Sequence, residues 1–195
     1  GATVLDQLID QLHPRFLIEV GTWKGLSAVH SIRRALTHNE DVAILCIDTW
    51  LGSYEHWLEA PWKEMLNCRN GFPQLYEQFL ANIMHSGLKD YVVPLPLSSG
   101  QAAILIDKLG LKSDFVYLDG GHDERSVQDD IDRFWPLVIP YGVLVGHDDS
   151  DTWPGVKKAV HRFFESAGDI FVHGTGGGKW YAQKKGRIAS SHHAV

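Results

Sequence analysis

A strand that leads directly into a glycine turn and a helix constrains this chain most. The apolar run at 16–18 (Phe-Leu-Ile) ends in Glu19, and Gly21 and Gly25 follow before a helical pattern begins. Such a turn lets the backbone approach a ligand closely, and the helix N-terminus offers free N–H groups to polar atoms. Glycine turns of this kind also occur in α/β proteins that bind no ligand, so this stretch alone leaves the function open.

The rest of the chain alternates between helix and strand patterns. Helical spacing of apolar residues occurs at 2–12, 26–36, 75–83, 101–109, 127–134 and 156–164. Apolar runs typical of strands occur at 16–19, 42–48, 91–97, 114–119, 141–147, 169–173 and 179–183, the last two around a glycine-rich loop. The alternation predicts an α/β fold with a mostly parallel seven-stranded sheet, helices on both faces and a C-terminal antiparallel hairpin.

The length and composition predict one domain. The 195 residues are 44% hydrophobic and 22% charged, which is enough for a full core. Within residues 1–195 we expect an N-terminal helix in 1–14 and a tail at 186–195. The segment 49–72 is predicted as irregular, and its length is typical of a lid over a binding site. Two prolines at 94 and 96 favour a less central strand in the sheet.

The charge and the cysteine content narrow the classes of partner. A net charge of −6 argues against nucleic acid or an anionic membrane as the main partner. Cys46 and Cys68 lack the CxxC spacing of a zinc or redox site. No membrane span or signal peptide is recognisable, which makes a cytoplasmic location the expectation. A homo-oligomer remains open.

Acidic residues follow several of the predicted strands. These are Glu19, Asp48, Asp119, Asp148 and Asp149. Ligands of open α/β sheets bind beyond the carboxyl ends of the strands, which is where these acids would converge. Asp48 can accept hydrogen bonds from ribose hydroxyls, or it can cap the helix that follows.

The last three of these acids suggest a metal site. If the strands that precede Asp119 and Asp148 are neighbours, the carboxylates of Asp119, Asp148 and Asp149 crowd together and require a cation or protons. Oxygen ligands of this kind suit Mg²⁺ or Mn²⁺, although the same acids can also cap helices. His122 and His147 adjoin these acids, and either can act as a general base or fill a structural role.

Four motifs together resemble class I S-adenosylmethionine-dependent methyltransferases. The motifs are 19–29 (EVGTWKGLSAV), 97–102 (LSSGQA), 115–122 (FVYLDGGH) and 142–149 (GVLVGHDD), and the likeness runs from about residue 15 to 184. It is strongest to metal-dependent small-molecule O-methyltransferases of the catechol, caffeoyl-CoA and macrocin types. The resemblance implies a Rossmann-like three-layer sandwich.

The resemblance also implies roles for individual residues. The cofactor S-adenosylmethionine (or S-adenosylhomocysteine) would be bound by Glu19, Gly21, Thr22, Trp23, Gly25, Ser27, Asp48, Thr49, Trp50, Ser99 and Asp119. Asp119, Asp148 and Asp149 would bind Mg²⁺ or a similar divalent cation, and His122 and His147 would be catalytic. His122 lies where catechol enzymes place a lysine base. The chain departs from sugar-acting relatives at Gly121, where many have an acid, and from catechol enzymes at Asp149, where they have asparagine.

The implied activity is metal-dependent O-methylation of a small-molecule hydroxyl of the sugar, phenol or polyketide type. Three alternatives stay open at this point. The same acids suit a metal-dependent hydrolase-type α/β enzyme, and the first motif alone suits a non-catalytic S-adenosylmethionine-binding domain. A nicotinamide enzyme is disfavoured because the GxGxxG spacing is absent.

Overall fold

The computed structural model describes residues 3–147, 150–166, 170–175 and 178–186. Its strands are β1 (Phe16–Val20), β2 (Ala43–Ile47), β3 (Val92–Leu95), β4 (Ser113–Leu118), β5 (Val138–Gly146), β6 (Ile170–Thr175) and β7 (Lys179–Lys184). Its α-helices are α1 (Val4–Leu12), α2 (Leu26–Leu36), α3 (Tyr54–Leu58), α4 (Ala60–Met65), α5 (Leu75–Ser86), α6 (Ser99–Lys108), α7 (Glu124–Phe134) and α8 (Pro154–Ser166). A 3₁₀ turn, η1 (Trp135–Leu137), joins α7 to β5.

The seven strands form one sheet in the order β3-β2-β1-β4-β5-β7-β6. The pairs from β3 to β5 are parallel, and β7 is antiparallel to both β5 and β6. This confirms the predicted α/β fold, its seven-stranded sheet and its C-terminal hairpin. β3 carries Pro94 and lies at the edge of the sheet, as its prolines predict.

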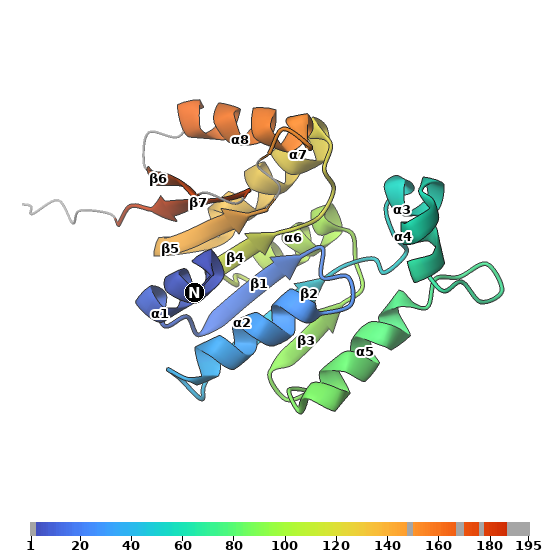
Figure 1. Ribbon diagram of the computed structural model, residues 1–195. Helices are drawn as coiled ribbons and strands as arrows, with labels where there is room; N and C mark the ends of the chain where they lie inside the picture. Colours follow the sequence, from blue (N-terminus) through green and yellow to red (C-terminus); the bar gives the residue numbers. More distant parts are fainter. Residues whose placement is uncertain (1–2, 148–149, 167–169, 176–177, 187–195) are drawn as a thin grey trace, which may run out of the picture.

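Helices cover both faces of the sheet (Figure 1). α1, α2 and α5 pack on one face, and α6, α7 and α8 pack on the other. Neighbouring strand residues such as Leu17 and Ile18 belong to opposite hydrophobic clusters, because successive side chains of a strand point to opposite faces. Within the described residues, no helix combines the length and apolar character that crossing a membrane requires.

Two local predictions from the sequence are wrong. The segment 49–72 is not irregular throughout, since it contains α3, α4 and a β-bridge between Arg69 and Phe72. α3 begins at a reciprocal cap in which the Ser53 backbone N–H donates to His56 Nδ1 at 2.9 Å, and α4 begins with a proline in its first turn. β5 starts at 138 instead of 141, because the 3₁₀ turn that holds Pro136 leads straight into the strand.

The centre of the sheet places β1 beside β4, although they are far apart in the sequence. The two strands end side by side, with Val20 paired to Leu118. Directly after β4, the Asp119 N–H donates to the Val20 carbonyl at 2.8 Å. Gly21 has a φ of +83°, and a Cβ at this position would lie 2.1 Å from the carbonyl oxygen of Asp119. The two loops are therefore in contact only because residue 21 has no side chain.

We expect Gly21→Ala to lower the free energy of unfolding by about 2–4 kcal/mol, because strain at positive φ adds to a backbone clash. Gly87→Ala is the matched control, since Gly87 has a φ of +76° and open space around its missing Cβ. That substitution should cost only about 1 kcal/mol. Urea denaturation of both variants measures the difference, and equal losses would contradict the close approach of the two loops.

Candidate active site

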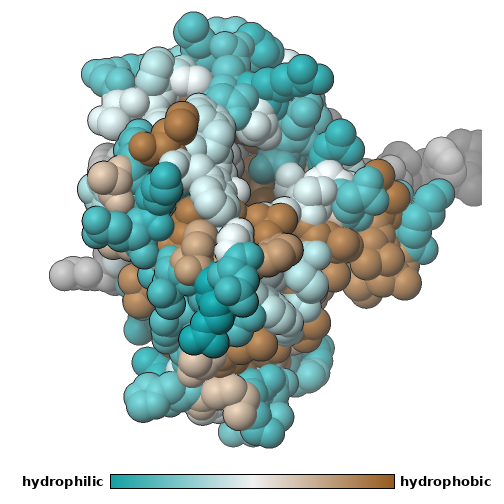
Figure 2. Space-filling view, turned by 90° about the vertical axis from the view of Figure 1, so that its right-hand side faces the viewer, coloured by the Kyte–Doolittle hydropathy of each residue, from teal (hydrophilic) through white to brown (hydrophobic). Residues whose placement is uncertain are grey.

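A cleft of about 420 Å³ opens at the carboxyl ends of the central strands. Figure 2 looks onto this end of the molecule, where hydrophobic surface lies between hydrophilic parts. The cleft is lined by Val20, Gly21, Trp23, Ile47, Asp48, Thr49, Gly52, Ser53, His56, Trp62, Leu97, Ser98, Ser99, Asp119, Gly120, Gly121, His122 and Asp130. It therefore lies where the chain order of the strands reverses, between β1 and β4, as expected for a ligand site in such sheets.

Asp48 is held rigidly at the end of β2. One carboxylate oxygen accepts the Trp23 N–H at 2.8 Å, and the other accepts the Trp50 N–H at 2.7 Å. Burial raises the pKa of Asp48, while these backbone hydrogen bonds act in the opposite direction. Each carboxylate oxygen has a further lone pair for a ligand hydroxyl.

Glu19 is a fully buried acid behind the glycine turn. Its Oε1 accepts a hydrogen bond from the Ser27 hydroxyl at 2.6 Å. Its Oε2 is buried and has no hydrogen-bond partner among the described residues. Burial raises the pKa of Glu19 to about 8, the Ser27 hydrogen bond opposes this, and the nearby charges of Asp119 and Asp48 add to it. A buried acceptor without a donor is costly, so this side chain favours a cationic or N–H ligand.

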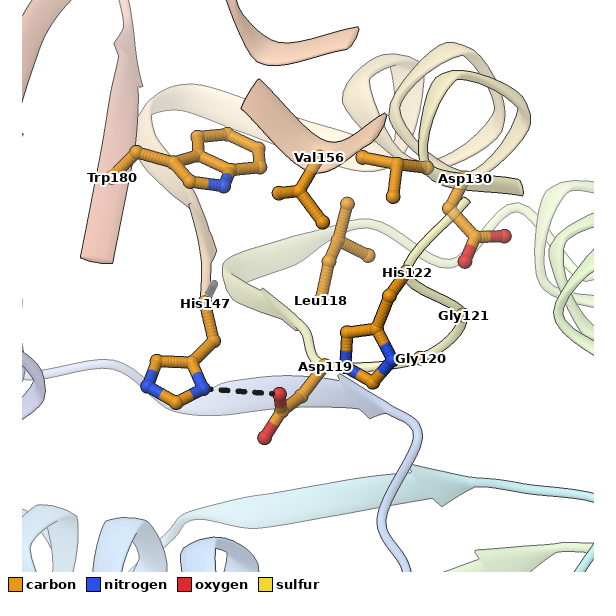
Figure 3. Close-up of a pocket in the computed structure, with 10 residues that line it drawn as sticks. Leu118, Asp119, Gly120, Gly121, His122, Asp130, His147, Val156 and Trp180 are labelled. Carbon is orange, nitrogen blue, oxygen red and sulfur yellow. Dashed lines mark ion pairs between the residues drawn. The ribbon is translucent and has the colours of Figure 1, made fainter. Parts of the chain in front are cut away.

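Asp119 lies between two histidines at the end of β4 (Figure 3). Its Oδ1 is 3.5 Å from Nδ1 of His147, and its Oδ2 accepts the Tyr117 hydroxyl at 3.0 Å. β4 and β5 are paired, with Leu118 opposite Gly146, so the residues that follow the two strands start side by side. A small cavity of about 20 Å³ beside Asp119 has room for about one water-sized group.

The structure describes only part of the predicted metal set. Asp148 and Asp149 lie outside the described residues. Among the residues that are described, no group of three acids, histidines or cysteines has the geometry to hold a metal ion. What the structure brings together is Asp119 and His147, with His122 lining the same cavity.

His122 contacts two elements that the sequence did not connect with it. Its ring stacks on Trp153 with centroids 4.2 Å apart. Its Nδ1 lies 3.8 Å from Oε2 of Glu55, which belongs to α3 and accepts a hydrogen bond from the Ser53 hydroxyl at 2.7 Å. Glu55 therefore adds a carboxylate to this site. The sequence carried no signal for it, because only the tertiary placement of α3 brings the two residues together.

Aromatic side chains form one wall of the cleft. Trp23 stacks on His56 with centroids 4.4 Å apart, and Trp62 meets both rings edge-on. Burial lowers the pKa of His56, which favours its neutral form in this stack. The segment that carries α3 and α4 thus contacts the loop after β1 as well as the loop after β4.

Several predicted cofactor residues do not line the cleft. The Trp50 side chain is buried in the core, where it packs against Tyr76 and Phe79. Only its backbone N–H reaches Asp48. The sequence did not reveal this, because an aromatic residue after an acid can turn either into the core or toward a ligand.

The remaining predicted residues fall into two sets. One set lines the cleft and consists of Gly21, Trp23, Asp48, Thr49, Ser99 and Asp119. The other set supports the turn from behind, outside the cleft lining, and consists of Glu19, Thr22, Gly25 and Ser27. Gly25 caps α2 in a left-handed conformation with Phe79 against it.

Asp130 is a cleft residue that the sequence analysis missed. It is 7% exposed and lies on the buried stripe of α7, among Val127, Ile131 and Phe134. Burial raises the pKa of Asp130 to about 6, while the Ser99 hydroxyl lowers it by hydrogen bonding. An acid at a core position of an amphipathic helix is the signal that could have indicated it, because buried acids need a polar partner.

This fold is shared with solved methyltransferases. An O-methyltransferase from Bacillus cereus in complex with SAH has a TM-score of 0.66 at 14% identity, covering 94% of this chain and 83% of that chain. The O-methyltransferase TomG from Streptomyces achromogenes, involved in tomaymycin synthesis and solved with SAM, has a TM-score of 0.64 at 15% identity, covering 94% and 78%. The O-methyltransferase NovP has a TM-score of 0.64 at 21% identity, covering 93% and 78%.

The architecture is therefore that of class I S-adenosylmethionine-dependent O-methyltransferases, as the sequence motifs predicted. A profile of the methyltransferase-domain family matches residues 18–148, which is more than half of the chain. The chain belongs to this family.

Proposed function

We propose that this chain transfers the methyl group of S-adenosylmethionine to a hydroxyl group of a small molecule with the help of a divalent cation. The observation that carries the proposal is that one cleft contains both Asp48 and Asp119, with His122 in the same lining. The first acid suits a ribose, and the second lies next to the two histidines. In this proposal, the cofactor site and the site for acceptor chemistry adjoin each other.

The residues of the cleft and of the turn behind it fit S-adenosylmethionine. Glu19 lies behind the turn, outside the cleft lining, and its unpartnered Oε2 would suit the ammonium group of the methionine portion. Gly21 keeps the surface of the turn free of a side chain, and Asp48 offers fixed lone pairs to the ribose hydroxyls. Further contacts to the cofactor would come from three other residues of the cleft lining, Trp23, Thr49 and Ser99. The conformation of the loops would be maintained by Thr22, Gly25, Ser27 and the Trp50 backbone.

The acids around the end of β4 support a divalent-cation site. Asp119 faces this part of the cleft, and Asp148 and Asp149 follow β5, the strand next to β4, by two and three residues. Oxygen ligands suit Mg²⁺ or Mn²⁺, and such a cation would lower the pKa of an acceptor hydroxyl. The metal requirement and the three ligands are parts of the proposal.

His122 is our choice for the general base. The stack on Trp153 and the nearby Glu55 carboxylate fix the orientation of its ring. Nδ1 faces Glu55, so Nε2 would take the proton of the acceptor hydroxyl. His147, 3.5 Å from Asp119, is the second candidate for the same role. The chain would thus orient the acceptor and remove its proton, while the cofactor supplies the activated methyl group.

A calorimetric titration of S-adenosylhomocysteine into metal-stripped protein tests the proposal. We expect saturable binding in the micromolar range and none for NADH, the control for a nicotinamide enzyme. Acceptor screens with sugar, phenol and polyketide hydroxyls, with and without Mg²⁺, would then measure transfer. Folded protein that binds no S-adenosylhomocysteine would contradict the proposal and favour a metal-dependent hydrolase. Binding with no transfer to any acceptor class would favour a non-catalytic cofactor-binding domain.

A further inference from the structure

Tyr117 and Lys179 form a chain of hydrogen bonds that ends on Asp119. The Lys179 Nζ donates to the Tyr117 hydroxyl at 3.4 Å, and that hydroxyl donates to Oδ2 of Asp119 at 3.0 Å. The same ammonium group lies 5.5 Å from the centroid of the Tyr117 ring, so a cation–π contact accompanies the hydrogen bond. The function proposed above gives no role to Tyr117 or to Lys179.

The register of the sheet explains why a residue of the C-terminal hairpin reaches this site. Leu118 of β4 pairs with Gly146 of β5, and Gly146 pairs with Trp180 of β7. Because β7 is antiparallel to β5, Lys179 lies one position further toward the carboxyl ends of β4 and β5. Successive side chains of a strand point to opposite faces. Trp180 therefore packs on the face covered by α6, α7 and α8, while Lys179 projects to the face that holds Tyr117.

The hydrogen bonds of this chain can run in one direction only. A lysine ammonium group has donors and no acceptor, so the Tyr117 oxygen must accept from Lys179. The single phenol proton is then left for Oδ2 of Asp119, because an ionised carboxylate only accepts. Tyr117 is 4% exposed, so its hydroxyl is largely shielded from competing water.

Both oxygens of the Asp119 carboxylate are therefore engaged. Oδ2 accepts from Tyr117, and Oδ1 lies 3.5 Å from Nδ1 of His147. In Figure 3 one oxygen faces His147 and the other points away from it. Rotation of the carboxylate would break one contact or the other, so its orientation is fixed. Partners that fix a metal-ligating side chain in this way typically contribute about 10–100-fold to metal affinity.

We infer that Tyr117 and Lys179 are positioning residues, which act through the Asp119 carboxylate and hold it in the orientation that binds a divalent cation. This inference rests on the proposed function, because it assumes that Asp119 is a ligand of the cation. It assigns to the first residue of β7, in the C-terminal hairpin, a role at the site that follows β4.

Removal of one hydroxyl tests the role of Tyr117. In Tyr117→Phe the affinity for Mn²⁺, followed by water-proton relaxation with S-adenosylhomocysteine present, should fall about 10-fold or more. The affinity for S-adenosylhomocysteine in metal-stripped protein should change less than about 2-fold, because the proposed cofactor contacts belong to other residues. Tyr91→Phe is the matched control, since Tyr91 packs on the same hydrophobic cluster but precedes β3, at the amino ends of the strands.

A double-mutant cycle tests whether Lys179 acts through Tyr117. Lys179→Met removes a hydrogen bond and also a positive charge that repels a cation. The charge effect is the same with or without the Tyr117 hydroxyl, so the cycle cancels it. We expect Lys179→Met to change the affinity for Mn²⁺ less favourably in the parent than in Tyr117→Phe, by at least about 3-fold. Equal changes in the two backgrounds would overturn the role of Lys179.

The remaining outcomes separate the inference from the proposed function. If the parent binds Mn²⁺ and Tyr117→Phe binds it as tightly, the inference is overturned and the cation site stands. If Tyr117→Phe loses affinity for Mn²⁺ and S-adenosylhomocysteine in parallel, the hydroxyl only supports the fold, and the inference is again overturned. If the folded parent binds no Mn²⁺, the proposed cation site fails and the inference fails with it.

Discussion

Replacing Glu19 with glutamine is expected to weaken binding of S-adenosylhomocysteine by at least about 100-fold and to stabilise the ligand-free protein above neutral pH. Glu19 is fully buried, and its Oε2 has no partner among the described residues. In the complex it would face an ammonium group, and the loss of one member of a buried ion pair typically costs about 3–5 kcal/mol. Without the ligand, the same charge has nothing to compensate it, so its removal helps the fold.

The pH dependence follows from the raised pKa of Glu19. The pKa is about 8 in the folded chain, compared with an ordinary value of 4.5. Folding therefore favours the protonated acid, and stability is complete below about pH 4.5, declines as pH rises and levels off above pH 8. Each pKa unit corresponds to about 1.4 kcal/mol, so the decline should amount to a few kcal/mol. Glu19→Gln should lack it.

Ligand binding should show the opposite trend. An ammonium group favours the ionised carboxylate, so binding at pH 7 should release a proton, and affinity should increase from pH 6 to pH 8. Calorimetry in buffers with different ionisation enthalpies counts the protons, and thermal melts from pH 5 to pH 9 follow stability. Glu40→Gln, at an exposed site, is the control. A Glu19→Gln variant that binds as tightly as the parent would exclude the proposed ammonium contact.

Replacing Asp119 with asparagine is expected to lower the affinity for Mn²⁺ about 100-fold and to abolish Mg²⁺-dependent methyl transfer. The substitution keeps the shape of the side chain and the contact with Tyr117, but it removes a negative charge from the proposed ligand set. Affinity for S-adenosylhomocysteine should change less than about 5-fold, since the ammonium and ribose contacts belong to other residues.

Mn²⁺ binding, followed by water-proton relaxation with S-adenosylhomocysteine present, measures this effect without a known acceptor. Asp132→Asn, on the exposed face of α7, controls for the loss of one negative charge. Unchanged Mn²⁺ affinity in Asp119→Asn would rule out Asp119 as a ligand. A similar loss in both variants would show that Mn²⁺ responds only to overall charge.

The sheet was predictable because its signals are local. Each strand is an apolar run bounded by turn residues, and Pro94 marks the edge strand without any knowledge of its neighbours. The acids at the strand ends were predictable for the same reason, since the carboxyl ends of parallel strands share one edge of the sheet. Asp48 and Asp119 therefore meet in one cleft.

The parts that were not predictable depend on tertiary contacts. α3 and α4 are 5 and 6 residues long, too short to be stable alone, so they form only against the rest of the protein. The contact between Glu55 and His122 exists only because α3 packs next to the loop after β4. Trp50 was expected beside the cofactor, but its ring packs against Tyr76 and Phe79 of α5. The position of this ring depends on how α5 packs, which the sequence around Trp50 does not reveal.

The pairing of β1 with β4 has a consequence for the kinetics of folding. Asp114 accepts hydrogen bonds from the backbone N–H groups of Arg15 and Phe16, which lie 99 and 98 residues away in the sequence. Closing a loop of that length is entropically costly and slow, and sheets with such long-range pairing are typical of slow folders. The cleft is complete only after this step, so intermediates that lack the pairing cannot bind the cofactor. A ligand that binds only the native chain would then slow its unfolding and protect it during synthesis and turnover.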